Sequence, residues 1–220
     1  MRDRVGTRRR AAARGGVGRR AAVNAHRHGP ATTPAGVMDT MRARRSVRVF
    51  TEKAVAREKI HAVLGAANRA PSAGNLQAYE VYVVHNRPTR ERLALAAGGQ
   101  SAVAHAPVLL VFCASPARSA VKYGERGKLL FSVQDATIAC AYAQLAAAAL
   151  GLGAVWVGAF DEGAAREALG LTRELRPVAM LPIGYPGEEP LDRGRRPLAS
   201  LAHYVPAAPH LEGDEQTGTP

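Results

Sequence analysis

The sequence predicts a layered domain of the α/β class, in which helices pack against a β-sheet. Two observations lead to this prediction. Short apolar, β-rich segments alternate along the chain with segments of helical periodicity. The composition is also that of a globular protein, since hydrophobic residues make up 47% and charged residues 22% of the 220 residues. A chain of this length can bury the core of one compact domain.

Helices are expected wherever apolar residues recur at the helical period. Thr40 is a candidate cap for a short first helix. A longer helix is expected from Thr51 to Ala70 and is ended by Pro71. The remaining expected helices cover residues 88–97, 134–150 and 162–169. Strands are expected over residues 80–84, 108–113, 155–157 and 177–183.

Residues 136–160 contain no charged side chain, so this stretch is long enough to test as a membrane span. It is built mainly from alanine, however, and Gly151 and Gly153 interrupt it before a β-rich segment begins. A buried or interfacial helix followed by a strand explains this pattern better. We therefore expect no membrane partner.

The formal net charge of +12 is concentrated near the N-terminus, where residues 1–37 hold nine arginines and one acid. Three interpretations of this segment stay open: a solvated tail, an extension upstream of a true start at Met38 or Met41, and a targeting or nucleic-acid-binding arm. The folded domain itself is not expected to bind nucleic acid. We predict a disordered extension over 1–37, one domain over 38–205 and a disordered tail over 206–220.

The two cysteines, Cys113 and Cys140, lie in apolar runs without the spacing of a zinc or redox motif. They are expected to be buried and reduced, which favours a cytoplasmic protein.

The familiar patterns of a catalytic site are absent from the sequence. The glycine pattern of a dinucleotide fold fails because Trp156 occupies its third position. There is no P-loop, no nucleophile elbow and no metal-type histidine cluster in the domain. We therefore name no catalytic acid, base, nucleophile or metal ligand, and we expect a cofactor to carry the chemistry.

Three polar clusters are candidates for binding such a cofactor. Residues 44–48 (Arg-Arg-Ser-Val-Arg) and 193–196 (Arg-Gly-Arg-Arg) carry guanidinium groups, which suit a phosphate dianion because they stay charged and form bidentate hydrogen bonds. Residues 71–77 (Pro-Ser-Ala-Gly-Asn-Leu-Gln) form a polar loop suited to the edge of a heterocycle. Taken singly, each arginine run could also be a solvated face, and the loop an ordinary turn.

In this order and spacing, the three clusters resemble the FMN-dependent nitroreductase family. The similarity extends to Gly-Leu-Gly-Ala-Val-Trp-Val-Gly-Ala-Phe at 151–160, Pro-Ile-Gly-Tyr-Pro at 182–186 and the arginine-rich close at 193–198, and it covers roughly residues 40–204. The resemblance implies a central mixed sheet flanked by helices, an intertwined homodimer and an FMN site between the subunits.

The resemblance also implies a role for each matching segment. The arginine segments hold the phosphate, except that Arg48 lies beside N1 and O2 of the flavin ring. The loop reaches the ring and ribityl chain from the partner subunit, and residues 158–159 approach the N5 side through their backbone. The cofactor-binding positions are Arg44, Arg45, Ser46, Arg48, Pro71, Ser72, Ala73, Asn75, Gln77, Gly158, Ala159, Arg193 and Arg195, with Arg196 a weaker candidate.

This chain departs from the family pattern after the loop, where Ala78 and Tyr79 replace a proline and a tryptophan. The loss of the proline predicts a less rigid loop. Tyr123, Arg126 and Trp156 are candidates for lining a substrate pocket, although Trp156 equally suits the core.

The function implied by the resemblance is a ping-pong reduction. NAD(P)H delivers a hydride to FMN, leaves, and is replaced by a nitro compound, a quinone or a similar small electron acceptor. A fixed cation stabilises the reduced, anionic ring, which is the role expected of Arg48. The alternatives are an oxidase or dehydrogenase of a specialised substrate on the same fold, nucleic-acid binding through residues 1–37, and flavin binding without turnover.

Overall fold

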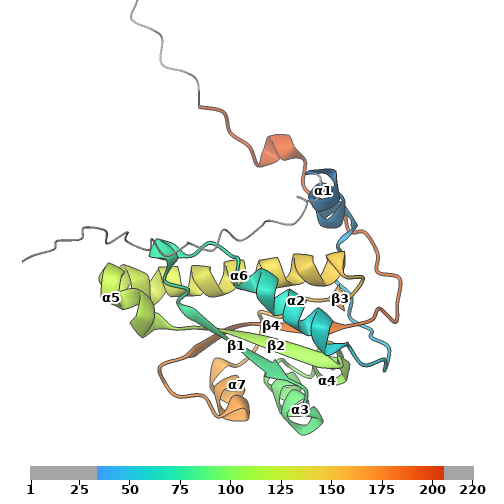
Figure 1. Cartoon of the computed structure of the whole chain (residues 1–220), viewed down its shortest axis with the longest axis horizontal. Helices are drawn as coiled ribbons and strands as arrows, with labels where there is room; N and C mark the ends of the chain where they lie inside the picture. The colour runs from blue at the N-terminus through green and yellow to red at the C-terminus, as the bar shows by residue number, and fades with distance from the viewer. Residues whose placement is uncertain (1–33, 206–220) are drawn as a thin grey trace, which may run out of the picture.

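The computed structural model describes residues 34–205, which form a four-stranded sheet with helices on both faces (Figure 1). The predicted layered α/β architecture is confirmed. The expectations for residues 1–33 and 206–220 lie outside the described part of the chain. The elements in chain order are α1 (Pro34–Ala43), α2 (Arg57–Ala67), η1 (Ala73–Asn75), β1 (Tyr79–Val84), α3 (Arg87–Ala96), α4 (Ser101–His105), β2 (Val108–Ala114), α5 (Pro116–Arg126), the π-helical turn η2 (Gly127–Phe131), α6 (Ser132–Ala149), β3 (Gly153–Ala154), α7 (Glu162–Leu169), β4 (Arg176–Gly184) and η3 (Leu198–Ser200).

The sheet has the strand order β1-β2-β4-β3, and each of these neighbouring pairs is antiparallel. The expected mixed character is limited, among residues 34–205, to one parallel bridge between Ser46 and Ala154. A bulge in the β2–β4 ladder places Phe112 opposite Ala179 and Cys113 opposite Pro177. The parallel bridge brings the first arginine segment to the edge of the sheet at β3.

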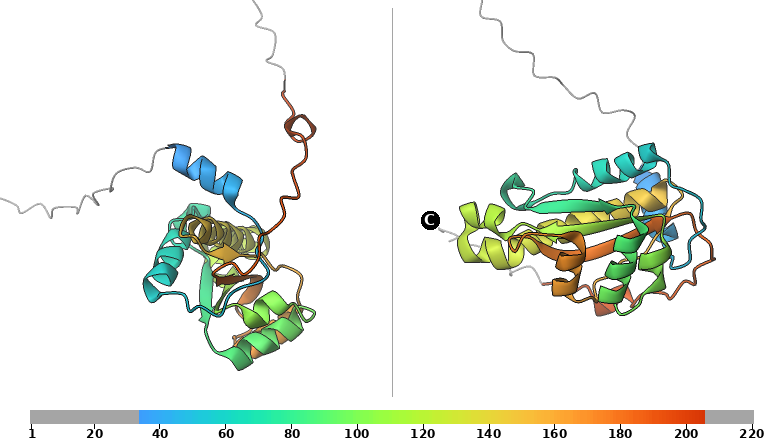
Figure 2. Two further views of the ribbon diagram at one scale, coloured as in Figure 1. Left: turned by 90° about the vertical axis from the view of Figure 1, so that its right-hand side faces the viewer. Right: turned by 90° about the horizontal axis from the view of Figure 1, so that it is seen from below.

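The sheet is buried on both faces, which explains why β2 is apolar without alternation. Leu110 and Phe112 belong to the core shared with α2 and α6. Leu109 and Val111 belong to the core shared with α3, α4 and α7. All seven residues of β2 are buried, and the two views of Figure 2 show the helices on either side of the strands.

The predicted apolar helix is α6, and it packs lengthwise on the sheet beside α2 (Figure 1). Its inner face is fully buried and is made of small side chains, such as Ala139 and Ala143 at 0% exposure. Its outer face is mostly apolar but includes the exposed Gln134, and Tyr142 on the same helix is 39% exposed. Gly151 follows the helix with φ 72°, a left-handed conformation that favours glycine. No helix among residues 34–205 is long and apolar enough to span a membrane.

Several expected element boundaries were wrong. The helix expected from Thr51 begins only at Arg57, because the preceding backbone pairs with the segment after β4, where the Thr51 N–H donates to the Tyr185 carbonyl at 2.9 Å. Thr40 lies inside α1 and bonds back to the Gly36 carbonyl, so it is not a cap. The strand expected over 155–157 is instead β3 at residues 153–154, and Val157 forms only an isolated bridge, to Met180.

Other expectations are close to the structure. The strands β1, β2 and β4 and the helices α3, α6 and α7 lie within two residues of their expected ends. Cys113 and Cys140 are buried and free, as expected. Burial raises the pKa of the Cys113 thiol to about 12, which makes it unreactive. The sequence did not predict α4, α5 or η2.

Candidate functional site

The two arginine segments meet in space, as expected for a shared anion site. Together they line a cavity of about 400 Å³ at one end of the molecule. Five arginines and three carboxylates surround it: Arg44, Arg45, Arg48, Arg193, Arg195, Glu188, Glu189 and Asp192, with Ser46 beside them.

The first segment is held at the sheet edge by Val47, which is 5% exposed. The Val47 N–H donates to the Ala154 carbonyl at 3.1 Å. Its side chain also lies directly against Gly153, where a Cβ would come within 2.8 Å of the Val47 Cβ. Glycine at this position therefore lets the segment approach, and the buried valine fixes the backbone from which Arg44, Ser46 and Arg48 project.

Two acidic residues that the sequence analysis did not identify hold the arginine segments together. Glu188 Oε1 accepts the backbone N–H groups of Arg48 at 2.5 Å and Val49 at 3.1 Å. These bonds lower the pKa of the Glu188 carboxyl. Asp192 accepts the Gly194 N–H at 2.9 Å and forms an ion pair with Arg45. A signal was present in the sequence, since three acids, at positions 188, 189 and 192, directly precede the arginines of residues 193–196.

Arg44 is the cation of the cavity whose surroundings most clearly favour a bound anion. It is partly buried, and no hydrogen bond from its guanidinium group to another described residue is found. Burial lowers its pKa, and the positive charges of Arg195 and Arg45 lower it further. A guanidinium group in this position gains most from an anion, which would supply both the missing hydrogen bonds and the missing negative charge. The cavity is therefore chemically suited to a phosphate.

The predicted loop adopts an unusual backbone conformation. Asn75, with φ 58°, and Gln77, with φ 43°, are the two non-glycine residues with positive φ among residues 34–205. Positive φ is costly for such residues and persists where other contacts enforce it. One such contact is internal, since Ser72 Oγ accepts the Gln77 N–H at 3.0 Å. The other involves α6, whose buried Asp135 accepts the N–H groups of Ala73 and Ala78.

Helix α5 packs against this loop. Arg118 donates to the Gln77 carbonyl at 2.9 Å and pairs with Glu80 at 2.7 Å. A Cβ at Gly74 would lie 2.6 Å from the hydroxyl oxygen of Tyr123, so the loop and the helix are in close contact. Tyr123 also packs edge-on against Phe131, 5.1 Å away between ring centroids.

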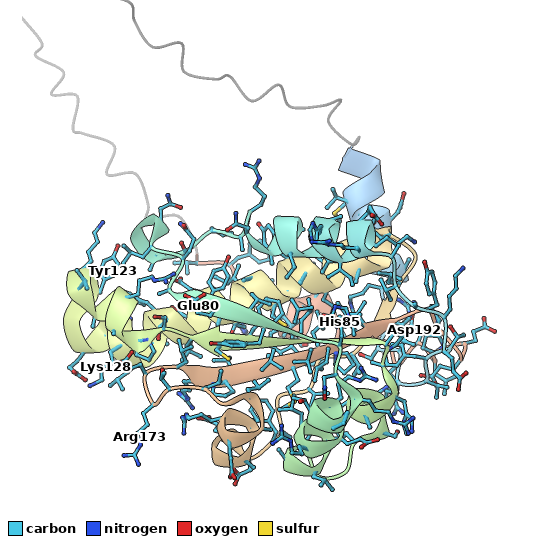
Figure 3. The ribbon with its side chains drawn as sticks, turned by 60° about the horizontal axis from the view of Figure 1, so that its bottom comes forward. Glu80, His85, Tyr123, Lys128, Arg173 and Asp192 are labelled. Atoms are coloured by element: carbon cyan, nitrogen blue, oxygen red, sulfur yellow. The ribbon has the colours of Figure 1, made fainter. Side chains whose placement is uncertain are left out.

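The loop and the arginine cavity lie at opposite ends of the folded domain. Tyr123 marks the loop end and Asp192 the cavity end, and Figure 3 shows them on opposite sides of the molecule. The same separation is visible in Figure 1 between α5, which packs against the loop, and α1, which leads into the first arginine segment. One chain therefore brings together the two arginine segments but not the loop.

Of the remaining expected positions, Trp156, Gly158 and Ala159 lie between β3 and α7, whereas Arg126 ends α5. Gly158 and Ala159 are exposed and follow the bridge between Val157 and Met180. Trp156 packs partly buried against the core on the α6 side, as one of the two interpretations expected. Arg126 stacks over the ring of Phe131 at 5.3 Å.

Comparison with known proteins identifies the family. The model of the nitroreductase family matches residues 41–103 and 94–185, which include α2, the loop, the whole sheet and α6. The chain belongs to the nitroreductase family. Both the first arginine segment and the loop lie within the matched residues, so they are part of this nitroreductase domain.

Named relatives agree with this assignment. An FMN reductase (NAD(P)H) of Bacillus subtilis is 30% identical over 194 residues, covering 82% of this chain and 77% of that protein. An oxygen-insensitive NADPH nitroreductase of Salmonella typhimurium is 31% identical over 166 residues, covering 72% and 69%. The solved structure of the NADPH:FMN oxidoreductase from Vibrio harveyi, complexed with NAD+, superimposes with a TM-score of 0.72 at 27% identity, covering 79% and 78%.

Proposed function

We propose that this nitroreductase-family protein is an FMN-dependent oxidoreductase that moves electrons from NAD(P)H to a small acceptor such as a nitro compound or a quinone. The observation that carries the proposal is the arginine cavity, where two segments far apart in sequence present guanidinium groups to one space. The names of the relatives, an FMN reductase and an NADPH nitroreductase, support the same chemistry.

The residues of the cavity fit the phosphate of FMN. Arg44 and Arg195 repel one another, and a dianion between them would relieve this repulsion. Arg45 is already paired with Asp192, so its role is to hold the second segment in place. Ser46 supplies a hydroxyl at the same wall. We assign phosphate binding to Arg44, Ser46, Arg193 and Arg195.

The redox step requires a group that stabilises negative charge on the reduced flavin ring. When bound, FMN would supply the centre that accepts a hydride from NAD(P)H and later reduces the acceptor. Arg48 lines the same cavity, and its exposed side chain forms no ion pair with a carboxylate within residues 34–205. A cation there would stabilise negative charge on the reduced ring without contacting the phosphate.

The active form is proposed to be a homodimer in which each site combines both chains. The separation of the loop from the arginine cavity within one chain supports this arrangement, because a second copy would supply the missing loop. The outer face of α6 is mostly apolar and partly exposed. Leu191, Leu198 and Leu201 of the C-terminal segment are 81%, 72% and 53% exposed, and a second copy would cover such apolar surface.

The cellular setting proposed is the cytoplasm. It is supported by the two cysteines, which are both buried and unpaired. Thiols in this state are typical of proteins from a reducing compartment.

The first test is the colour of the purified protein. We expect a yellow protein with flavin absorbance, from which mass spectrometry of the released cofactor identifies FMN, and turnover of a nitroaromatic compound with NADH or NADPH. A colourless protein that takes up no FMN would contradict the proposal. A flavoprotein that is not reduced by either nicotinamide would favour the oxidase or dehydrogenase alternative.

The composite site can be tested by mixing two defective variants. Arg195→Ala damages the cavity and Asn75→Ala damages the loop. If each site draws on both chains, a mixed dimer has one site with both defects and one intact site, so unfolding and refolding the two variants together should restore activity. A site built from one chain would gain nothing from mixing. Sedimentation at micromolar concentration should show dimers, and a monomer that holds FMN would refute the arrangement.

A further inference from the structure

Helix α6 contains a buried carboxylate, Asp135, that has no role in the proposed phosphate site. Asp135 is 2% exposed and has no ion-pair partner among residues 34–205. It sits beside Ala136 and Ala139 on the inner face of the helix. A charge in such surroundings costs free energy unless hydrogen bonds compensate for the lost water.

Within the described residues, the compensating hydrogen bonds come from the loop and the residue that follows it. Asp135 Oδ1 accepts the N–H of Ala73 at 2.9 Å, and Oδ2 accepts the N–H of Ala78 at 3.2 Å. These two residues stand at the two ends of the strained segment that contains Asn75 and Gln77. One side chain therefore fixes both ends of the loop relative to α6.

Asp135 is not simply a helix cap. The turns before α6 are helical, and Phe131 and Ser132 have right-handed helical backbone angles, so the chain enters α6 from η2 without a free end. No side-chain cap bond is formed at this junction. The carboxylate is directed instead to a segment about 60 residues earlier, at separations of 62 and 57 residues.

We propose that Asp135 is a positioning residue of the flavin site. Its carboxylate holds residues 73–78 in the conformation that presents Ser72 and Asn75 to the cofactor of the partner subunit. This inference rests on the proposed function, because it takes the loop to be a flavin-binding element. Ala78 matters in particular: it stands where the family pattern has a proline, and its N–H, which a proline would lack, is the group that Oδ2 binds.

The first experiment needs no variant and no cofactor. Amide hydrogen exchange on the FMN-free protein should show the N–H groups of Ala73 and Ala78 exchanging far more slowly than those of the exposed segment 190–197. Fast exchange at both positions would overturn the inference whether or not the protein binds FMN. The result therefore does not depend on the proposed function.

The second experiment compares Asp135→Asn with a matched control. The amide offers one acceptor for two N–H donors, so exchange across residues 71–79 should accelerate, the Kd for FMN should rise about ten-fold or more, and the visible circular dichroism of bound FMN should change. Asn86→Ala removes one comparable bond, to the Thr89 N–H at 2.9 Å, from α3 on the other face of the sheet. It should lower the melting temperature but leave the Kd and the dichroism unchanged.

A double-mutant cycle identifies the contact through which Asp135 acts. Ala78→Pro removes the donor that Oδ2 binds, so Asp135→Asn should weaken FMN binding less in that background than in the native chain. Additive effects on the Kd would refute the proposed contact. If the native protein binds FMN and Asp135→Asn leaves its Kd and dichroism unaltered, the positioning role is wrong while the proposed function stands. If the native protein binds no FMN, the proposed function fails, and the positioning role fails with it.

Discussion

Replacing Arg195 by alanine separates phosphate binding from every other role of the cavity. Arg195 lies near enough to Arg44 that its charge lowers the Arg44 pKa, so the two cations repel one another in the empty protein. A bound phosphate reverses this situation, because it attracts both. The substitution should therefore have opposite effects on the empty and the loaded protein.

The size of each effect follows from the type of contact that is lost and from its exposure to water. Loss of one charge-assisted contact to the phosphate costs about 1.5–3 kcal/mol, which corresponds to a rise of roughly 10-fold to 150-fold in the Kd for FMN. In the empty protein, Arg195 is exposed and Arg44 only partly buried. Relief of their repulsion should then raise the free energy of unfolding by less than about 1 kcal/mol, because water screens the pair.

Flavin titration and thermal unfolding with and without FMN measure both effects. Riboflavin, which lacks the phosphate, is an internal control, and its affinity should not change. Arg173→Ala removes an exposed arginine far from Asp192 (Figure 3) and controls for the net charge. If Arg195→Ala weakens FMN and riboflavin equally, or weakens FMN no more than Arg173→Ala does, the cavity is not the phosphate site.

Three further predictions follow from other contacts. Arg48→Ala should lower the midpoint potential of the bound flavin and slow hydride uptake while changing oxidised-FMN affinity less than Arg195→Ala does; potentiometry that shows no shift would make Arg48 merely another phosphate ligand. Gly153→Ala should destabilise the protein by about 1–3 kcal/mol, because the new Cβ would lie 2.8 Å from that of Val47, and Val47→Ala in the same chain should recover part of the loss in denaturant unfolding. Glu162 has a lowered pKa, caused first by its hydrogen bond from Arg176. The stability that this pair adds is therefore complete above the unfolded carboxyl pKa near 4.5 and is lost as the pH falls through the lower folded-state pKa. In Glu162→Gln the melting temperature should depend less on pH below about 4.5, and an unchanged profile would count against the pair.

Local sequence determined much of the secondary structure. Residues 108–113 form an unbroken apolar run, and such a run is stable as a strand only where both faces of a sheet are covered. The structure covers both faces. The helix over 162–169 was predicted with its observed ends, because Asp161 caps it and Gly170 ends it with φ 63°. In these elements the signals lie within a few residues of each other.

Tertiary contacts decided the elements where prediction failed. The expected helix included residues 51–56, yet the backbone of residues 49–51 pairs with residues 185–187, and α2 begins only at Arg57. Asp135 gave a weak signal as the single acid of an apolar helix, but its two partners are 57 and 62 residues away. Hydrogen bonds between distant segments override local preference when they satisfy groups that would otherwise be buried without a partner.

The sequence alone determined which residues of the candidate site carry a fixed positive charge and which form a polar loop. Only the tertiary structure decided their placement. It joined Arg45 to Asp192 across 147 residues of chain and put the loop at the opposite end from both. The reason is physical. Charge and hydrogen-bonding capacity belong to each side chain, whereas the distance between two side chains depends on how the whole core packs.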